Sequence, residues 1–346
     1  MDVADLDYEL PEHRIAQQPV EPRDAARLLV DRGPGRAPDH RQVADLPSLL
    51  GPGDVMVVND TRVLRARLRL QKATGGAVEV LLLEATVDGW EALVRPSRKV
   101  PPGTELLVAG SEAPLVRVDD DLGGGRRRVR LLAGGDDLEV LERHGDVPLP
   151  PYVRERLADP ERYQTVYAAR PGSVAAPTAG LHLTPAVLDG CRDAGVEIHR
   201  VELGVGLGTF RPIAVDRVED HEMHEERYVV PETTLAACRR ARRVLAVGTT
   251  SVRALESAAA TGRLEGRTDL FIHGDHPWRI VDLLLTNFHV PRSSLLAMID
   301  AFVGPRWRDL YAEALAGDYR FLSFGDAMVL RRSRGGERPI PGEDQP

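Results

Sequence analysis

The chain of 346 residues is 42% hydrophobic, which is enough apolar material for a sizeable core in one large domain or two. Its formal net charge of -8 disfavours a protein that coats nucleic acid nonspecifically, because such binding needs many basic groups to neutralise phosphates. No apolar run approaches the roughly 18 residues of a membrane span. Because the start is also acidic, unlike a secretory signal, we expect a cytoplasmic protein that does not enter a membrane.

The first sixty residues end in a predicted buried strand, the apolar run 55–58, which follows a Gly-Pro-Gly turn. Residues 65–149 have a different sequence pattern. Short β segments, several of them with alternating apolar and polar residues, are separated by Gly, Pro or Asp turns. Six such segments at roughly ten-residue spacing predict a small barrel or sandwich, and of these we expect the closed β-barrel.

Helical segments and apolar strands alternate from residue 150 onward, beginning with a helix that Thr184 and Pro185 open as N-cap and first-turn proline. A strand is also expected over residues 268–273. Alternation of this kind predicts a three-layer α/β domain with a largely parallel or mixed sheet. We expect residues 1–64 and 150–330 to form this domain, interrupted by the six-stranded barrel 65–149, with 331–346 as a disordered tail.

Ligands of α/β sheets bind outside the carboxyl ends of strands, and four loops at such ends carry polar residues. They are "NDTR" (59–62), "GVGLGTFRP" (204–212), "VGTTSVR" (247–253) and "LLTNFHVPRSS" (284–294). None is a Walker loop or a dinucleotide fingerprint. A single Gly-rich loop is more often a tight turn, but four polar loops at the ends of one sheet favour a ligand site. The third loop opens a helix, whose free N–H groups suit a carboxylate or phosphate.

Histidines and arginines outside these loops leave alternatives open. "DHEMHEERY" contains His221 and His224, but it lacks the HExxH spacing and a distant third ligand, so surface histidines or substrate contacts are favoured over a metal. The two cysteines, Cys191 and Cys238, likewise indicate neither a zinc site nor a disulfide framework. Arginines cluster within 62–69, 126–130 and 239–243, where a solvated face with compensating acids is the simpler interpretation.

The stretch "SVAAPTAGLHLTP" (173–185) combines small residues, two prolines and one histidine. A backbone with such small side chains can lie close against a ligand. His182 is either an acid/base group in this segment or a residue that braces the loop.

Nine segments together resemble the S-adenosylmethionine:tRNA ribosyltransferase-isomerase family of queuosine biosynthesis. They are "DYELPEHRIAQQPVEPRDAARLLV", "GDVMVVNDTRVLRARL", "PLPPYVRE", "ERYQTVYAARPGSVAAPTAGLHLT", "GVGLGTFRP", "HEMHEERY", "AVGTTSVRALES", "VDLLLTNFHVPRSSLL" and "YRFLSFGDAMVL". They span residues 5 to 330 in the family's order, which is more specific than any one motif. The chain departs from the family pattern at Gly204, where a histidine usually precedes "VGLGTF".

The resemblance implies an α/β domain interrupted by a small β-barrel and an unusual reaction. The ribosyl part of S-adenosylmethionine is transferred to 7-aminomethyl-7-deazaguanine at the wobble position of a tRNA with a GUN anticodon. Isomerisation then gives epoxyqueuosine, adenine and methionine. S-adenosylmethionine is a consumed co-substrate, and the resemblance implies neither a metal nor another cofactor. We expect a monomer.

Roles for individual residues are hypotheses that go beyond the resemblance. The acid/base candidates are His182, His289, Asp60 and Asp326, although Asp326 alternatively closes a turn with Gly325. Residues 248–251 would hold the methionine carboxylate, Arg253 or Arg211 would pair with anionic groups, and Phe210 would stack on a base. The full substrate-binding set is Asn59, Thr61, Arg62, Thr178, Gly180, Gly206, Gly208, Thr209, Phe210, Arg211, His221, His224, Gly248, Thr249, Thr250, Ser251, Arg253, Asn287 and Arg292.

Two other functions remain open at this point. One is a diverged relative that uses S-adenosylmethionine or a nucleoside with another acceptor, and the other is a noncatalytic RNA-binding protein. Adenine release that depends on the modified tRNA distinguishes the three.

Overall fold

The computed structural model describes residues 1–206 and 212–333, and these form two compact units. The α/β unit contains Met1–Thr61, Pro150–Arg170 and the described chain from Ala176 onward, and the barrel unit contains Arg62–Leu149 and Pro171–Ala175. The predicted loop residues Gly208, Thr209, Phe210 and Arg211 lie outside the described residues.

A nine-stranded mixed sheet organises the α/β unit, in the order β16-β14-β13-β3-β15-β17-β18-β1-β2. Its strands are β1 (Arg27–Val30), β2 (Asp39–Gln42), β3 (Asp54–Asn59), β13 (Glu197–Leu203), β14 (Glu226–Val229), β15 (Arg243–Val247), β16 (Glu265–Thr268), β17 (Leu283–Asn287) and β18 (Ala327–Arg331). The four central strands β13, β3, β15 and β17 run parallel, whereas β18 is antiparallel to β17. Every residue of β3 is buried, as expected for a central strand covered on both faces.

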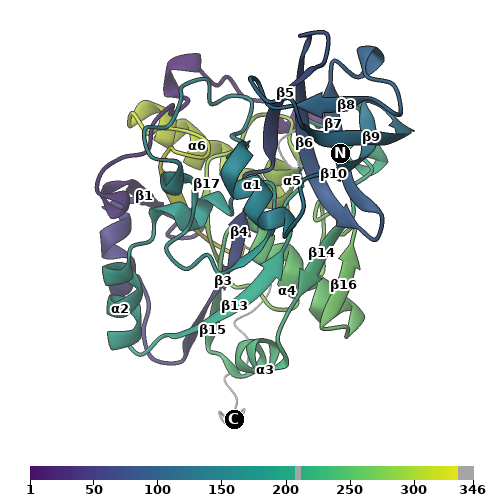
Figure 1. The fold of residues 1–346 in the computed structure, drawn as a ribbon. Helices are drawn as coiled ribbons and strands as arrows, with labels where there is room; N and C mark the ends of the chain where they lie inside the picture. Colours follow the sequence, from purple (N-terminus) through teal and green to yellow (C-terminus); the bar gives the residue numbers. More distant parts are fainter. Residues whose placement is uncertain (207–211, 334–346) are drawn as a thin grey trace. The chain divides into compact units, whose positions relative to one another are not determined.

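Helices cover both faces of this sheet (Figure 1). On one face, Met56 and Val58 of β3 pack in one cluster with Val187 and Leu188 of helix α2 (Pro185–Asp193). Helix α4 (Thr249–Thr261) packs against β3, β13, β15 and β17, and α3 (Glu232–Arg240) packs against α4. Helix α5 (Ser294–Val303) contacts β18 and is followed by α6 (Trp307–Ala316). The predicted opening of α2 is confirmed, because Thr184 Oγ1 accepts a hydrogen bond from Val187 N.

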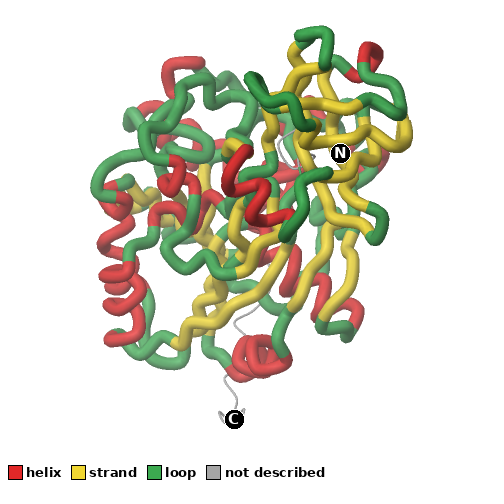
Figure 2. Tube along the Cα trace, in the orientation of Figure 1, coloured by secondary structure: helices red, strands yellow, loops and turns green. Residues whose placement is uncertain are grey.

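The barrel unit contains a closed antiparallel barrel of six strands, drawn in yellow in Figure 2. These are β5 (Arg67–Lys72), β6 (Ala77–Thr86), β7 (Gly89–Arg95), β8 (Glu105–Leu107), β9 (Pro114–Gly123) and β10 (Arg126–Leu131), and pairing of β5 with β8 closes the ring. Helix α1 (Asp137–His144) leads into β11 (Gly145–Asp146), which pairs with β5. Strands β4 (Thr61–Val63) and β12 (Arg170–Ser173) form a separate two-stranded sheet. The predicted fold class, a mixed α/β domain with a small closed barrel, is confirmed.

Two local predictions differ from the structure. Of the strand expected over 268–273, only Thr268 is in a strand, because the Arg253 guanidinium bonds the carbonyl oxygens of Thr268 and Leu270 and turns the chain away from the sheet. Three residues of the expected tail belong to the folded unit: Arg331 ends β18, Arg332 pairs with Asp282, and Ser333 N donates to Phe302 O. None of the described helices is both long and apolar enough to cross a membrane.

Candidate active site

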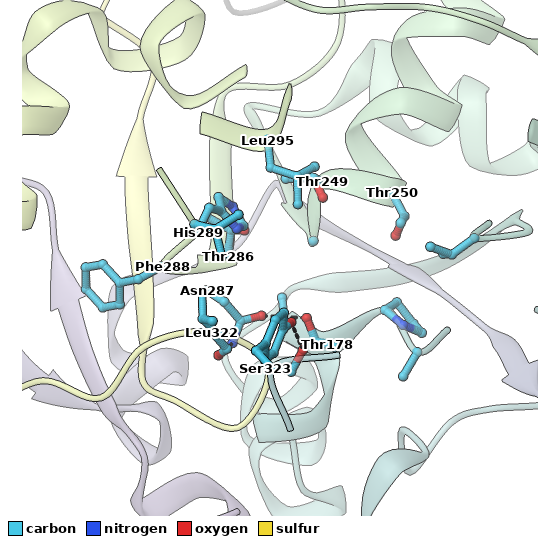
Figure 3. A pocket seen from close by; sticks show the side chains of 17 residues that line it. Thr178, Thr249, Thr250, Thr286, Asn287, Phe288, His289, Leu295, Leu322 and Ser323 are labelled. Carbon is cyan, nitrogen blue, oxygen red and sulfur yellow. Dashed lines mark hydrogen bonds between the residues drawn. The ribbon is translucent and has the colours of Figure 1, made fainter. Parts of the chain in front are cut away.

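A pocket lies at the carboxyl ends of β15 and β17, within the α/β unit (Figure 3). Its walls come from the start of α4, the end of β17 and the loop after it, the 3-10 helix Thr178–His182, and the loop before β18. It is lined by Tyr152, Ala176, Pro177, Thr178, Ala179, Val205, Gly248, Thr249, Thr250, Thr286, Asn287, Phe288, His289, Val290, Leu295, Leu322 and Ser323. Thirteen of these seventeen residues, all except Tyr152, Leu295, Leu322 and Ser323, belong to the predicted loops or to the stretch 173–185.

The start of helix α4 presents hydrogen-bond donors to this pocket. Gly248 precedes the helix with a φ of 85°, a conformation that favours glycine, and so turns the chain from β15 into α4. The Thr250 hydroxyl is buried and has no hydrogen-bond partner among the described residues. A helix start with free N–H groups and an unused hydroxyl suits a carboxylate.

His289 supplies a neutral imidazole to the pocket wall. Its Nε2 lies 3.1 Å from the Thr286 hydroxyl, its backbone N–H donates to Tyr311 Oη at 3.0 Å, and its carbonyl accepts from Tyr8. Burial lowers the pKa of His289 to about 3. A neutral imidazole that lines the pocket is a group that can accept a proton.

Asn287 connects β17 to the predicted His182 loop. Its amide donates to His182 Nε2 at 3.0 Å and to the Leu322 carbonyl at 3.2 Å, and its oxygen accepts from the Thr178 hydroxyl at 2.9 Å. Burial lowers the pKa of His182 to about 4, so its ring is neutral. His182 lies behind Asn287 and is not among the described residues that line the pocket, so this geometry favours the role of a brace.

Asp60 follows the central strand β3 and is 2% exposed. Its Oδ2 lies 3.6 Å from Arg200 and 3.9 Å from Arg170, whereas its Oδ1 has no hydrogen-bond partner among the described residues. Burial raises the pKa of Asp60, against the opposing effect of the two arginines. The next residue, Thr61, also has a buried hydroxyl without a partner in the described chain.

Three predicted ligand residues have side chains that form hydrogen bonds or ion pairs within the fold. The Asn59 amide bridges β3 and β13 through hydrogen bonds to Leu203, and its oxygen also accepts from Thr61 N. The Ser251 hydroxyl donates to the Val247 carbonyl at 2.8 Å. Arg253 forms a buried ion pair with Glu226 in addition to its two carbonyl contacts, so it holds α4 in place and does not face the pocket.

Asp326 and Arg292 are likewise engaged in holding loops. The Asp326 carboxylate accepts from the backbone N–H groups of Arg27 at 2.9 Å and Arg320 at 2.7 Å, so it closes the loop before β18. Arg292 pairs with Asp7 near the amino terminus.

The remaining predicted residues lie at the edges of the site or away from it. Gly180 packs against Tyr167, and the Gly206 N–H donates to Glu226 Oε1 at 3.0 Å. The His221 ring packs edge-on against Phe271, and burial lowers its pKa, while His224 is exposed. Arg62 belongs to the barrel unit. No three His, Cys, Asp or Glu side chains within the described ranges are placed to hold a metal ion.

Sequence reasoning assigned no role to two groups that line the pocket. The Tyr152 hydroxyl lies 2.6 Å from Ser323 Oγ, and burial raises the pKa of Tyr152 to about 12. Both residues occur in segments that carry the family resemblance, "PLPPYVRE" and "YRFLSFGDAMVL". The family resemblance was therefore a sequence signal for both residues, but their segments are distant in sequence from the four loops at the strand ends.

Comparison with known proteins places this chain in a family. The sequence profile described as "Queuosine biosynthesis protein" matches residues 3–330. The chain belongs to this family. The expected resemblance is thus confirmed, and it covers nearly the whole folded chain.

Curated relatives carry a more specific name. The S-adenosylmethionine:tRNA ribosyltransferase-isomerase of Rubrobacter xylanophilus is 51% identical, over 94% of this chain and 96% of the relative. A protein of the same name from Thermus thermophilus is also 51% identical, over 94% of this chain and 98% of the relative. A crystal structure of S-adenosylmethionine tRNA ribosyltransferase from Thermotoga maritima is 35% identical with a TM-score of 0.54, covering 94% of this chain and 99% of that one.

Proposed function

We propose that this protein transfers the ribosyl moiety of S-adenosylmethionine to 7-aminomethyl-7-deazaguanine at the wobble position of tRNA and isomerises it. The products are epoxyqueuosine-tRNA, adenine and methionine. The observation that carries the proposal is the family match over residues 3–330, with full-length relatives of that name at 51% identity.

The chemistry requires groups that move protons in a protected pocket. The sulfonium acidifies the hydrogens on the adjacent ribosyl carbon, so a positioned base can remove one. The incoming amine must be neutral to attack, and adenine must be protonated as it leaves. No step of this scheme requires a metal or redox cofactor, because the sulfonium itself activates the donor.

The described residues support distinct roles in this reaction. The α4 start, with Gly248 and a Thr250 hydroxyl that has no partner in the described part of the chain, suits the methionine carboxylate. His289 is the best-placed acid/base group, because it lines the pocket and stays neutral. His182 and Asn287 position Thr178 and the wall beside it. Asp60 is a second candidate, and unlike His289 it is a carboxyl group.

Three finer features belong to the same proposal. The acceptor is a tRNA with a GUN anticodon, which the family resemblance implies. The protein acts in the cytoplasm, where such tRNAs are modified, and it acts as a monomer.

A noncatalytic RNA-binding function is less well supported by the arginine clusters. On β10, Arg126 pairs with Glu91, Arg127 with Asp121 and Arg128 with Asp120. Arg242 and Arg243 both pair with the buried Asp54. These arginines have compensating acids, so they do not form a free basic surface for phosphates.

Adenine release tests the proposal directly. The wild-type protein should release adenine from S-adenosylmethionine only when tRNA carrying the 7-aminomethyl-7-deazaguanine base is present. Release with another acceptor would favour the diverged relative, and tRNA affinity without release would favour the binding protein.

Replacing His289 with Gln tests its role in the chemistry. We expect the single-turnover rate of adenine release to fall about 10²-fold to 10⁴-fold, as for loss of a general base, while S-adenosylmethionine affinity changes little. The exposed His144 on α1 provides a matched control, and its Gln variant should react at the wild-type rate. An unchanged rate in His289→Gln would remove His289 from the mechanism.

A further inference from the structure

Four buried polar groups without partners gather where the chain leaves β3. Asp60 Oδ1 and the hydroxyls of Thr61, Thr165 and Tyr167 have no hydrogen-bond partner among the described residues, and each of these residues is less than a tenth exposed. Buried polar groups are normally hydrogen-bonded, and leaving them unpaired is costly. A group of them near the pocket is therefore a place where a bound polar group can complete their hydrogen bonding.

Backbone contacts hold Asp60 and Tyr167 together. The N–H groups of Ala169 and Arg170, which follow Tyr167, both donate to the Asp60 carbonyl, at 2.9 and 3.2 Å. The Tyr167 hydroxyl in turn lies against Gly180, whose neighbour Ala179 lines the pocket. The unpartnered groups are thus linked to the pocket wall through Gly180.

The charge of this cluster selects the kind of ligand. A carboxylate oxygen accepts hydrogen bonds, and the three hydroxyls can all act as acceptors, so the cluster fits a group with several N–H donors and a positive charge. The cations already present, Arg170 and Arg200, both face Oδ2, with side chains 55% and 53% exposed. Arg170 also pairs with Glu202, and Arg227 lies 3.9 Å from the same glutamate, so solvent and Glu202 moderate their charge.

We propose that Asp60 and Tyr167 form a subsite for a primary ammonium group of the substrate. This inference rests on the proposed function, which provides two such groups: the α-ammonium of S-adenosylmethionine and the aminomethyl group of the acceptor base. An ammonium group has three donors, so Oδ1 and two of the Tyr167, Thr61 and Thr165 hydroxyls could accept its hydrogen bonds.

The strand register favours the α-ammonium. Val58 of β3 is level with Val247 of the parallel strand β15. Asp60 lies two residues after Val58, and Thr249, the first residue of α4, lies two residues after Val247. The carboxylate of Asp60 and the start of α4 therefore follow neighbouring strands at the same level, as the ammonium and carboxylate of one amino acid require.

Binding measurements with the full chain test the subsite. The probes are S-adenosylmethionine and its desamino analogue, in which hydrogen replaces the α-amino group, and the variants are Asp60→Asn and Tyr167→Phe. We expect the wild type to prefer S-adenosylmethionine and Asp60→Asn to bind it about tenfold to hundredfold more weakly, as for loss of a charged hydrogen bond. Affinity for the desamino analogue should change less than about twofold. Tyr167→Phe should reduce the same preference by a smaller factor.

Binding of two tRNAs, with and without the aminomethyl base, distinguishes the source of the ammonium group. If the subsite instead holds the acceptor amine, Asp60→Asn will lose the preference for tRNA bearing the aminomethyl base over the same tRNA bearing guanine, and will keep its preference for S-adenosylmethionine. Equal weakening of both members of each pair, or no weakening, would overturn the subsite.

Controls separate this inference from folding and from the proposed function. Asp189→Asn, at an exposed position on α2, should bind all probes as the wild type does. If Asp60→Asn does not fold, Tyr167→Phe still decides the question, since the Tyr167 hydroxyl makes no hydrogen bond with any residue that the structure describes. Wild-type protein that releases no adenine contradicts the proposed function, whereas loss of the amine preference in the variants supports the subsite independently.

Discussion

At the scale of single residues, hydrogen-bond partners distinguish the polar groups that can bind a ligand from the polar groups that hold the fold together. Asn59, Ser251 and Asp326 carry the polar side chains that a ligand site needs, but their hydrogen bonds go to backbone groups. Thr250 and Asp60 are also buried, but each has a polar atom with no partner in the described chain. Residue type alone does not separate these two sets.

Replacing Thr250 with Val is expected to affect binding and not folding. The change removes a hydroxyl that has no partner in the described chain, so stability should stay the same or rise slightly. Affinity for S-adenosylmethionine should fall about fivefold to tenfold, as for one lost hydrogen bond. Calorimetric titration and urea unfolding measure the two effects. The exposed Thr233 on α3 gives the control variant Thr233→Val, and a destabilised Thr250→Val with normal affinity would contradict this role.

At the scale of elements, the 3-10 helix Thr178–His182 is fixed from two sides. Asn287 of β17 bonds both ends of it, through Thr178 and His182. On another side, Gly180 packs so closely on Tyr167 that a Cβ at this position would overlap the phenol oxygen. The bare composition of this segment thus has a packing reason, in addition to bringing its Thr178 and Ala179 to the pocket.

Gly180→Ala should therefore destabilise the α/β unit. Overpacking of this kind costs about 1–3 kcal/mol. In the double variant Gly180→Ala, Tyr167→Phe the oxygen is gone, so we expect a smaller loss than the sum of the two single changes. Urea unfolding of the four proteins gives the coupling. Additive losses would show that the phenol oxygen is not what excludes a side chain at position 180.

At the scale of the whole molecule, burial of neutral histidines couples folding to pH. His182 and His289 stay neutral in the folded protein down to about pH 4 and about pH 3. In the unfolded chain, histidine takes up a proton near pH 6.5. The unfolded state therefore binds more protons below this pH, and stability that is complete above about pH 7 is lost as the pH falls.

We expect these two histidines to remove about 2 kcal/mol of stability between pH 6.5 and pH 5.5. Urea unfolding at pH 7.5, 6.5 and 5.5 measures the loss. His182→Gln and His289→Gln should each remove about half of the pH dependence. The raised pKa of Asp60 instead adds stability as the pH falls. This effect is the same in the wild type and in both variants, so the difference between them still reports the histidines. The same pH dependence in both variants would contradict the assignment.

Much of the fold could be predicted because local patterns reflect it. The apolar run 55–58 became part of β3, Thr184 caps α2, and the change of texture after residue 64 corresponds to the antiparallel barrel strands. The strand expected over 268–273 was wrong beyond Thr268 because a distant guanidinium, that of Arg253, takes its carbonyl oxygens.

The sequence alone determined the family, the fold class and the loops in which the pocket residues lie, because these depend on motif order, periodicity and the chemistry of strand ends. Tertiary structure alone decided which polar groups in those loops remain free. It turned Arg253 and Asp326 toward the fold and left Asp60 Oδ1 and the Thr250 hydroxyl without partners in the described chain. It also brought Tyr152 to the pocket wall and the Tyr167 hydroxyl against Gly180. The physical reason is that a hydrogen bond is made with whatever group the packed chain brings within about 3 Å, and that neighbour is usually far away in sequence.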